Sequence, residues 1–333
     1  MLILWLRFVS FAALIVIAAT QLSRNADIIA EKTGLGRAWV GALLLPVATS
    51  LPEIVTSTQA TVLGNPDIAL GNVFGSNMFN IFIIAVVDLF QGRGPVLYYV
   101  SSGHILSAAV GIILIGLTCL GIVIGAEFTV PVLGIGFDSL LLLAVFLGGL
   151  RLIGRYERKR GGSDDTEEAR YRDCTLPRAG IVFAIAAIMI VIAGRQVAIA
   201  ADELSRVTVL GGTFVGSFLV AVTTSLPELV TTLTAVRLGA YDMAIGNIMG
   251  ANIMNIFIIV VTDLVYREGS VLSVVSQDNL ITGFLAIVLM AIAVTGLIYR
   301  SRRSIFYLGF DAIAIIVLYF AGLGLLFASG IGI

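Results

Sequence analysis

Two stretches of the sequence repeat one polar pattern inside apolar surroundings. The copies lie 175 residues apart (228 − 53) and read ATSLPE at 48–53 and GNVFGSNMFN at 71–80, then TTSLPE at 223–228 and GNIMGANIMN at 246–255. Each copy therefore places one glutamate, a group of hydroxyls and a row of asparagines within a long apolar run. A carboxylate in such a run is costly to bury in a membrane, so Glu53 and Glu228 are candidate functional residues.

The first part of each copy predicts a broken helix that presents oxygen atoms. Thr49, Ser50 and Glu53 are three or four positions apart and share one helix face. Pro52 has no N–H, so the carbonyl four residues before it loses its helical partner, and Pro227 has the same effect in the second copy. In hydrocarbon, such a carbonyl is tolerated only where it lines a cavity or meets a ligand.

The second part of each copy predicts a polar stripe on a neighbouring helix. Its polar positions are four residues apart, and paired glycines at the same spacing let helix backbones approach closely. These residues are Asn72, Ser76 and Asn80 with Gly71 and Gly75, and then Asn247, Ala251 and Asn255 with Gly246 and Gly250. Carboxylate, hydroxyl, amide and carbonyl oxygens are hard ligands, which suit Ca²⁺, Na⁺ or Mg²⁺ rather than soft metals.

The composition requires a membrane to surround these motifs. Hydrophobic residues make up 59% of the 333 residues, charged residues only 12%, and the mean hydropathy is +1.05, which excludes a soluble domain of this length. The net charge of −1 and the absence of a basic tract give no indication of nucleic-acid binding. Two cysteines and one histidine match no zinc site or disulfide framework, and no enzyme cofactor is implied.

Apolar runs of about 20 residues predict an all-α membrane protein with ten transmembrane helices. The homologous halves each hold five spans, so the second half must lie inverted in the membrane, an architecture typical of transporters. The predicted organisation is a first five-helix repeat at 1–153, a cytoplasmic linker at 154–178 and an inverted repeat at 179–333. The predicted spans are 2–22, 38–62, 67–90, 103–125, 131–153, 179–199, 210–237, 242–265, 279–299 and 304–330.

The placement of lysine and arginine predicts the orientation. Sixteen of the 20 basic residues fall on the side of the middle loop, which is therefore expected in the cytoplasm with both termini outside. We expect a multi-pass protein of the plasma membrane, the inner membrane in a bacterial cell. Its expected partners are the lipid bilayer and inorganic cations, and the oligomeric state is left open, a monomer included.

Antiparallel halves would bring Glu53 and Glu228 together near the membrane centre. Two carboxylates neutralise one divalent cation, and without an ion the two anions would repel each other until at least one holds a proton. Proline kinks and asparagine stripes can also be purely structural, but their joint appearance in both halves favours a site. Acids outside the motif receive other interpretations: Asp27, Asp202, Asp88 and Asp263 as solvated residues at span ends, and Asp138 and Asp311 as packing or hydrogen-bonding residues.

With these paired motifs the chain resembles the sodium/calcium exchanger branch of the cation/calcium exchanger superfamily. The resemblance covers nearly the whole chain, with ten spans, inverted halves and a polar middle loop. It implies a Ca²⁺ antiporter in which Glu53, Glu228, Thr49 and Thr224 hold the central calcium. It further implies a site for the counter-transported Na⁺ formed by Ser50, Ser225, Ser76 and the carbonyls of Pro46 and Ala221.

The chain departs from the pattern of that family in three ways. Ala48 and Thr223 replace the glycine that opens each core, Ala251 replaces the hydroxyl that would match Ser76, and Asn255 stands where an aspartate is usual. These differences affect the residues expected to bind Na⁺ rather than the pair of glutamates, and they leave the sodium stoichiometry open. A symmetric Asn80/Asn255 pair could also serve another coupling ion or another divalent cation.

The sequence thus predicts a non-enzymatic antiporter that exports Ca²⁺ in exchange for Na⁺ by alternating access around Glu53 and Glu228. The alternative within transport is exchange of a divalent cation for H⁺ or another monovalent ion, with the carboxylates carrying the protons. A passive cation channel is a further alternative from a different class. An intramembrane enzyme is disfavoured, because no nucleophile–base pair or metal triad accompanies the motif.

Overall fold

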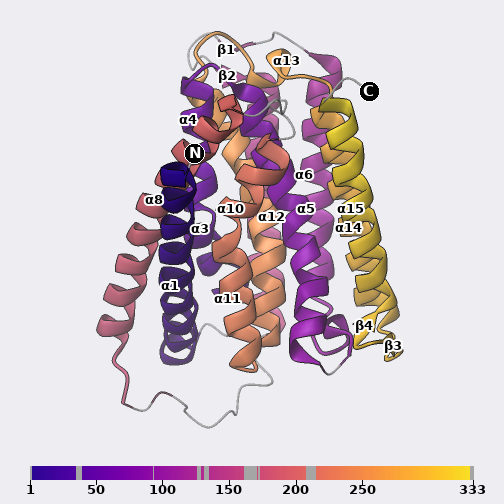
Figure 1. Cartoon of the computed structure of the whole chain (residues 1–333). Helices are drawn as coiled ribbons and strands as arrows, with labels where there is room; N and C mark the ends of the chain where they lie inside the picture. The colour runs from indigo at the N-terminus through magenta and orange to yellow at the C-terminus, as the bar shows by residue number, and fades with distance from the viewer. Residues whose placement is uncertain are drawn as a thin grey trace.

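The computed structural model is a bundle of long helices (Figure 1). It describes residues 2–34, 40–92, 94–125, 129–130, 135–160, 171, 173–207 and 215–330. The first half comprises α1 (Leu2–Thr33), η1 (Val40–Leu44), α3 (Leu45–Thr49), α4 (Leu51–Val62), α5 (Pro66–Gln91), η2 (Val96–Tyr98), α6 (His104–Ile124), β1 (Thr129–Val130), β2 (Ile135–Gly136) and α7 (Phe137–Arg160). The second comprises α8 (Leu176–Val207), η3 (Val215–Val220), α10 (Ala221–Thr224), α11 (Leu226–Arg237), α12 (Tyr241–Val265), α13 (Val271–Val274), α14 (Asn279–Tyr299), β3 (Ser304–Ile305), β4 (Leu308–Gly309) and α15 (Phe310–Gly330).

The described residues contain eight helices that are long and apolar enough to cross a membrane. Two further spans are bent pairs: Val40–Thr49 with Leu51–Val62, at an angle of 41°, and Phe218–Thr224 with Leu226–Arg237, at 42°. These ten spans confirm the predicted fold class of two inverted five-helix repeats. Both termini lie at one end of the bundle, and the end of α7 and the start of α8 lie at the other (Figure 1).

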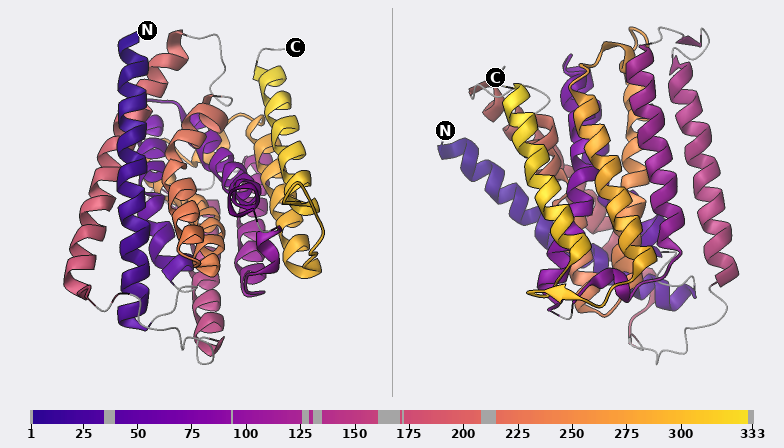
Figure 2. Two further views of the ribbon diagram at one scale, coloured as in Figure 1. Left: turned by 60° about the horizontal axis from the view of Figure 1, so that its bottom comes forward. Right: turned by 90° about the vertical axis from the view of Figure 1, so that its right-hand side faces the viewer.

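Some predicted boundaries were wrong. Helices α1 and α8 each contain 32 residues and continue well past positions 22 and 199. Helix α7 continues to Arg160 and α8 begins at Leu176, so part of segment 154–178 is helical. Each of the two long helices would measure about 48 Å, which exceeds the hydrocarbon thickness of a bilayer. Figure 2 shows α1 crossing the bundle at a slant, which lets a long helix remain within the membrane.

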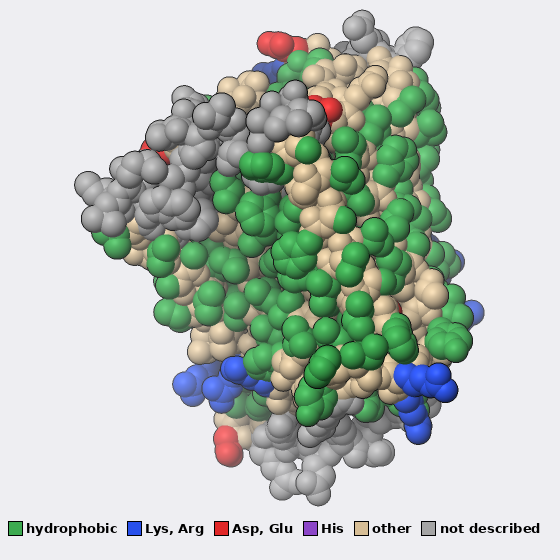
Figure 3. Space-filling model, turned by 45° about the vertical axis from the view of Figure 1, so that its right-hand side comes forward, with side chains coloured by type: hydrophobic (Ala, Val, Ile, Leu, Met, Phe, Trp, Pro, Cys, Tyr) green, Lys and Arg blue, Asp and Glu red, His purple; other side chains and the backbone are tan. Residues whose placement is uncertain are grey.

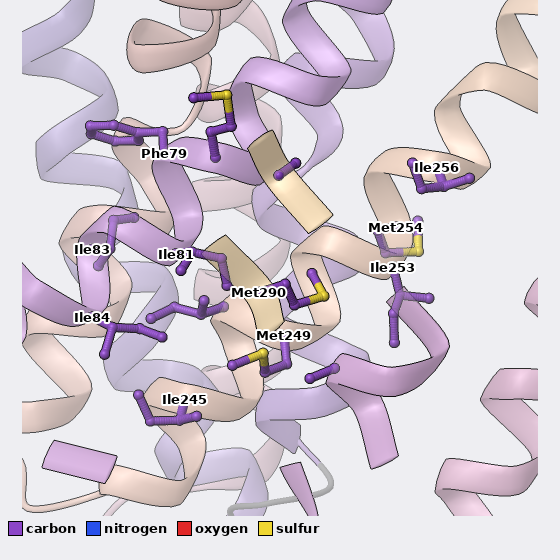
Figure 4. Close-up of a cluster of buried hydrophobic side chains, with 14 of the residues drawn as sticks. Phe79, Ile81, Ile83, Ile84, Ile245, Met249, Ile253, Met254, Ile256 and Met290 are labelled. Atoms are coloured by element: carbon purple, nitrogen blue, oxygen red, sulfur yellow. The ribbon is translucent and has the colours of Figure 1, made fainter. Parts of the chain in front are cut away.

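The central helices are α5 and α12, one from each half, which pack against each other. Most of the residues in both helices are buried, as expected of helices surrounded by protein. Their side chains form a dense cluster with α14, in which Ile81, Ile84, Met249, Ile253 and Met290 are buried (Figure 4). The polar stripe of each copy therefore lies on a helix that neighbouring elements hold in place.

Helices α1 and α8 pack along each other at one side of the bundle (Figure 1). They expose large apolar side chains, including Ile17, Ile181 and Ile188, as expected of a surface in contact with lipid. On another face, hydrophobic side chains cover the middle of the molecule, and lysine and arginine side chains gather near its lower edge (Figure 3). This distribution fits a protein that spans a bilayer.

Two aspartates at the ends of the central helices join the halves. Asp88 at the end of α5 accepts hydrogen bonds from the N–H groups of Val96 (2.7 Å) and Gly309 (3.0 Å), the latter just before α15. Asp263 at the end of α12 accepts from Val271 (2.7 Å) and from Gly136 just before α7 (2.8 Å). Both carboxylates are buried, so their prediction as solvated acids was wrong.

The other acids outside the motif differ in their outcomes. Asp27 was wrongly predicted as solvated, since it is buried and accepts a hydrogen bond from the Tyr171 hydroxyl (2.8 Å). Asp138 was correctly predicted as a hydrogen-bonding residue and accepts from the Ser270 hydroxyl (2.7 Å). The side chain of Asp202 lies outside the described residues.

Replacing Asp88 with alanine is expected to lower the free energy of unfolding by about 2–4 kcal/mol, because two buried N–H groups lose a charged acceptor. Thermal unfolding in detergent, followed by size-exclusion chromatography, measures this loss. Asp278 is exposed, and its replacement with alanine is the control, with an expected change within about 0.5 kcal/mol. Equal stability of the two variants would show that Asp88 does not join the halves.

Candidate cation-binding site

The site forms where the second and seventh spans break. Helix α3 ends at Thr49 and α4 begins at Leu51, so Ser50 lies at the break, with Pro52 in the first turn of α4. Ser225 occupies the same position between α10 and α11, with Pro227 after it. A π-helical segment precedes each break, η1 in the first half and η3 in the second. The predicted proline-induced breaks are therefore confirmed in both copies.

Each glutamate is held by a serine of the opposite half. The Ser225 hydroxyl donates to Glu53 Oε1 (3.0 Å), and the Ser50 hydroxyl donates to Glu228 Oε1 (3.2 Å). All four side chains are completely buried. The glutamates are near enough to interact electrostatically, and the hydroxyls of Thr224 and Thr49 lie beside Glu53 and Glu228 respectively. The structure thus brings these residues together from both halves.

The asparagines at the start of each stripe connect the two broken helices. The Thr224 hydroxyl donates to Asn72 Oδ1 (3.0 Å), and the Asn72 amide donates to the Ser57 hydroxyl (2.9 Å). In the second copy the donor to Asn247 Oδ1 is Thr49 (3.5 Å). The Asn247 amide in turn donates to the hydroxyls of Thr231 (3.0 Å) and Thr232 (3.2 Å). Both asparagines therefore orient a threonine that lies next to a glutamate.

Four further asparagines interlock where α5 and α12 meet. The Asn80 amide donates to Asn252 Oδ1 (3.0 Å), and the Asn255 amide donates to Asn77 Oδ1 (2.9 Å). These bonds leave Asn80 Oδ1 and Asn255 Oδ1 without a hydrogen-bond partner among the described residues. Both oxygens are acceptors that a cation could use.

The carbonyls of Pro46 and Ala221 already accept hydrogen bonds. The Ser50 N–H donates to Pro46 O (2.9 Å), and the Ser225 N–H donates to Ala221 O (3.0 Å). Each carbonyl also receives the hydroxyl of the neighbouring threonine, at 3.5 Å from Thr49 and 3.3 Å from Thr224. They lie beside the site, but any contact to an ion would share an oxygen that helix bonds already use.

Sequence reasoning missed several supporting residues. Asn77 and Asn252 carry the bonds between the central helices, and Ser57, Thr231 and Thr232 hold the first asparagine of each stripe. The signal for the asparagines was present, because both copies repeat them at the 175-residue offset. Ser57 and Thr232 also share that offset, and both are hydroxyl residues on the face of a broken helix.

The side chains of the two motifs form a cage, and the oxygens in it that lack a hydrogen-bond partner determine what it could bind. Five buried acceptor oxygens of the two motifs have no hydrogen-bond partner among the described residues: Oε2 of Glu53, Oε2 of Glu228, Oγ of Ser76, Oδ1 of Asn80 and Oδ1 of Asn255. Buried acceptors without a partner are costly and rare. Oxygens from both halves that point to no protein donor can instead ligate a hard cation.

No group of three or more His, Cys, Asp and Glu side chains that could hold a metal ion occurs in the described part of the chain. The candidate site combines only two carboxylates with neutral hydroxyl and amide oxygens. Such a set can bind a cation and release it again, because it lacks the excess of anionic ligands that holds a resident ion tightly.

Comparison with known proteins places the chain among transporters. The sequence matches the family "Sodium/calcium exchanger protein" over residues 3–153 and 179–328. Inner membrane protein YrbG of Escherichia coli (strain K12) is 31% identical over 254 residues, 74% of each chain. Putative antiporter CaxA of Alkalimonas amylolytica is 25% identical over 303 residues, which cover 87% of this chain and 90% of CaxA.

A short region is much more similar to one further relative. Sodium/calcium exchanger MaX1 of Methanosarcina acetivorans is 57% identical over 47 residues, 14% of this chain and 13% of MaX1. Among solved structures, the sodium-calcium exchanger NCX_Mj soaked with 2.5 mM Na⁺ and 1 mM Sr²⁺ aligns with a TM-score of 0.69 and 21% identity, over 97% of this chain and 99% of NCX_Mj. That likeness confirms the ten-span fold. The protein is a multi-pass membrane protein that belongs to the sodium/calcium exchanger family.

Proposed function

We propose that the protein exchanges Ca²⁺ for Na⁺ across a membrane by alternating access around Glu53 and Glu228. The observation that carries this proposal is the set of buried, unpartnered oxygens that the two motifs present together. Family membership supports cation exchange in general. The names of MaX1 and NCX_Mj, both sodium/calcium exchangers, support the choice of ions.

The ligand set favours Ca²⁺ over Mg²⁺. Calcium takes about six to eight oxygen ligands in flexible geometry, whereas magnesium requires an octahedron and usually keeps several of its waters. The cage supplies carboxylate, hydroxyl and amide oxygens from four broken or central helices, an irregular set that suits the larger ion. In this proposal Thr49 and Thr224 join the two glutamates around calcium.

Exchange follows from competition for the same carboxylates. Calcium and sodium both need Glu53 and Glu228, so both cannot occupy the site fully at once. An empty site would hold two neighbouring anions in a medium of low dielectric constant unless a proton neutralises one of them, and two such anions are costly. Only the charge-compensated, loaded site would cross between the two open states, and this requirement couples the two fluxes. Ser50, Ser225, Ser76 and the carbonyls of Pro46 and Ala221 are proposed to contribute to sodium binding.

The proposed orientation places the segment between α7 and α8 in the cytoplasm and both termini outside. The location of the termini at one end of the bundle supports it (Figure 1), as does the excess of lysine and arginine on the side of the middle loop. In such an antiporter an inward Na⁺ gradient would drive Ca²⁺ out of the cell, whichever way the protein is oriented.

Radioactive Ca²⁺ uptake into proteoliposomes tests the coupling ion. Vesicles preloaded with Na⁺ and diluted into Na⁺-free buffer are expected to accumulate Ca²⁺, whereas vesicles with K⁺ or H⁺ gradients are not. Accumulation driven by a pH gradient alone would instead establish proton coupling. Uptake that needs no internal counter-ion and does not saturate would identify a channel.

A further inference from the structure

The hairpin between α14 and α15 carries basic side chains at one end of the bundle. It consists of β3 and β4 and lies at the same end as the end of α7 (Figure 1). Arg300 caps α14, and Arg302 and Arg303 precede β3; all three are exposed. None of them forms an ion pair with a carboxylate in the described part of the chain. Their charge is therefore available to an anion from outside the protein.

The tip of this hairpin holds two aromatic residues in an unfavourable conformation. Phe306 and Tyr307 have φ angles of 50° and 70°, in the left-handed region. A two-residue loop with positive φ at both positions normally holds asparagine or glycine, and bulky residues are costly there. Both side chains are also exposed, Phe306 at 87% and Tyr307 at 61%. Contact with the membrane–water interface, where amphipathic aromatic rings are enriched, explains such a tip.

An apolar pocket of about 280 Å³ opens beside the hairpin, and we call it the α14–α15 pocket. Its walls come from α14, α15 and η2, and include Leu97, Ile292 and Ala314. Tyr299 and Phe310 also line it and are exposed, so it opens to the outer surface that faces lipid. A hydrocarbon chain from the bilayer matches the chemistry of these walls.

Tyr98 joins the arginines to the pocket. Its side chain lines the pocket, and the Arg302 guanidinium lies over its ring, 4.7 Å from the centroid, and donates to its hydroxyl. Arg300 donates to the carbonyls of Tyr98 (3.2 Å) and Val100. A guanidinium has five N–H donors, so Arg302 retains donors for a phosphate. Donors of positive charge therefore stand next to an apolar pocket.

One acid also lines the pocket. The Asp311 carboxylate accepts hydrogen bonds from backbone N–H groups at the start of its own helix, those of Asp311 and Ala312. No other charged residue of the described chain lines the pocket. The charges nearest to a molecule that enters between the hairpin and the pocket are thus mainly positive.

The first half of the chain lacks this set of charges. At the 173-residue offset that relates the fifth and tenth spans (300 − 127), the three arginines are replaced by Glu127, Thr129 and Val130. The basic hairpin is therefore confined to one side of the membrane, the side of the middle loop. In the proposed orientation this side faces the cytoplasmic leaflet, which holds anionic lipids.

We propose that the hairpin and the α14–α15 pocket form a binding site for an anionic phospholipid. The lipid phosphate contacts Arg302 and Arg303, and one acyl chain occupies the pocket. Arg300 is a positioning residue that ties the hairpin to η2. The buried chain adds affinity that a free phosphate ion lacks.

Native mass spectrometry of the full chain in detergent, with added dioleoyl lipids, measures the headgroup preference. Phosphatidylglycerol is expected to bind at least about tenfold more tightly than phosphatidylcholine, which has the same chains and no net charge. Inorganic phosphate at the same concentration is expected not to displace it. Equal affinity for the two lipids, or displacement by phosphate, would overturn the inference.

The double variant Arg302→Gln/Arg303→Gln tests the headgroup contacts. Each basic residue near an anionic lipid contributes about fivefold in affinity, so phosphatidylglycerol binding is expected to weaken about 30-fold. Arg155→Gln/Arg158→Gln removes two exposed charges from α7 at the same end and should leave binding unchanged. An equal loss in this control would show a general effect of charge and no specific site.

The variant Ala314→Phe fills the pocket and leaves the arginines in place. It is expected to weaken phosphatidylglycerol binding about tenfold, the equivalent of about two buried methylene groups. Ala321 lies on α15 outside the pocket and is exposed, so Ala321→Phe is the matched control and should bind as the parent does. If Ala314→Phe also binds as the parent does, the acyl chain lies elsewhere and the inference fails.

Discussion

Replacing Glu53 or Glu228 with glutamine is expected to abolish Na⁺-dependent Ca²⁺ uptake and to weaken Ca²⁺ binding by at least about 1,000-fold. For unit charges 4 Å apart, Coulomb's law gives about 4 kcal/mol at an effective dielectric constant of about 20, and a divalent ion doubles this energy. Glutamine keeps the shape of the side chain and can still accept the serine hydroxyl. The variants therefore remove charge with little change in packing.

The same substitution at Glu268, which is exposed in the described structure, provides the matched control and should leave uptake unchanged. Without ions, the glutamine variants should be at least as stable as the parent, because the repulsion between two buried anions is removed. This outcome would separate loss of the site from loss of folding. Normal Ca²⁺ uptake by either variant would refute the proposed role of the pair.

The second large effect is expected at glycines where the halves meet. A Cβ atom added at Gly250 of α12 would lie 2.5 Å from Pro46 Cγ and 2.6 Å from Ala42 O. One added at Gly41 of η1 would lie 2.5 Å from the carbonyl oxygen of Met243 in α12. Since backbone atoms occupy these positions, Gly41→Ala and Gly250→Ala are each expected to lower the free energy of unfolding by about 3 kcal/mol or more.

Glycines with open surroundings provide the comparison for this prediction. Gly116 in α6 and Gly148 in α7 have no atom within 4 Å of an added Cβ. Their replacement with alanine should leave stability unchanged or raise it by up to about 1 kcal/mol, because alanine favours the helix. Thermal unfolding of the four variants in detergent tests the contrast. If Gly41→Ala and Gly250→Ala unfolded at the temperature of the controls, the close approach of α12 and η1 would be wrong.

The repeated motif in the sequence predicted the close helix packing at these glycines. Paired glycines four residues apart indicated close helix packing, and in the second copy Gly246 and Gly250 both lie against the backbone of residues 41–42. The breaks at Ser50 and Ser225 followed from Pro52 and Pro227, because proline cannot supply the N–H that a continuous helix needs. Ten spans followed from the lengths of the apolar runs.

Other features depended on contacts between distant segments, which no local pattern contains. Asp88 and Asp263 were taken for solvated acids because they lie near span ends. In the fold, the turns before α15 and α7 reach back and place backbone N–H groups against them. The extra length of α1 and α8 was missed for a related reason, since polar residues in their last turns resemble a loop until their tertiary contacts are known.

Within the candidate site, the sequence identified the chemical groups but not their partners. The apolar surroundings of Glu53 and Glu228 predicted a functional role for the two carboxylates, and that role stays a prediction. The exchange of partners, in which each glutamate binds the serine of the other half, could be seen only once the two halves were packed together. The bonds of Asn77 and Asn252 depend in the same way on the register between α5 and α12.

Anomalous diffraction from crystals soaked in Sr²⁺, a heavier divalent substitute for Ca²⁺, would locate the bound cation. We expect one strong anomalous peak between Glu53 Oε2 and Glu228 Oε2, with the Thr49 and Thr224 hydroxyls near it, and loss of the peak in crystals of Glu53→Gln. A Sr²⁺ ion bound elsewhere in the membrane, or a peak that persists unchanged in Glu53→Gln, would contradict the proposed site.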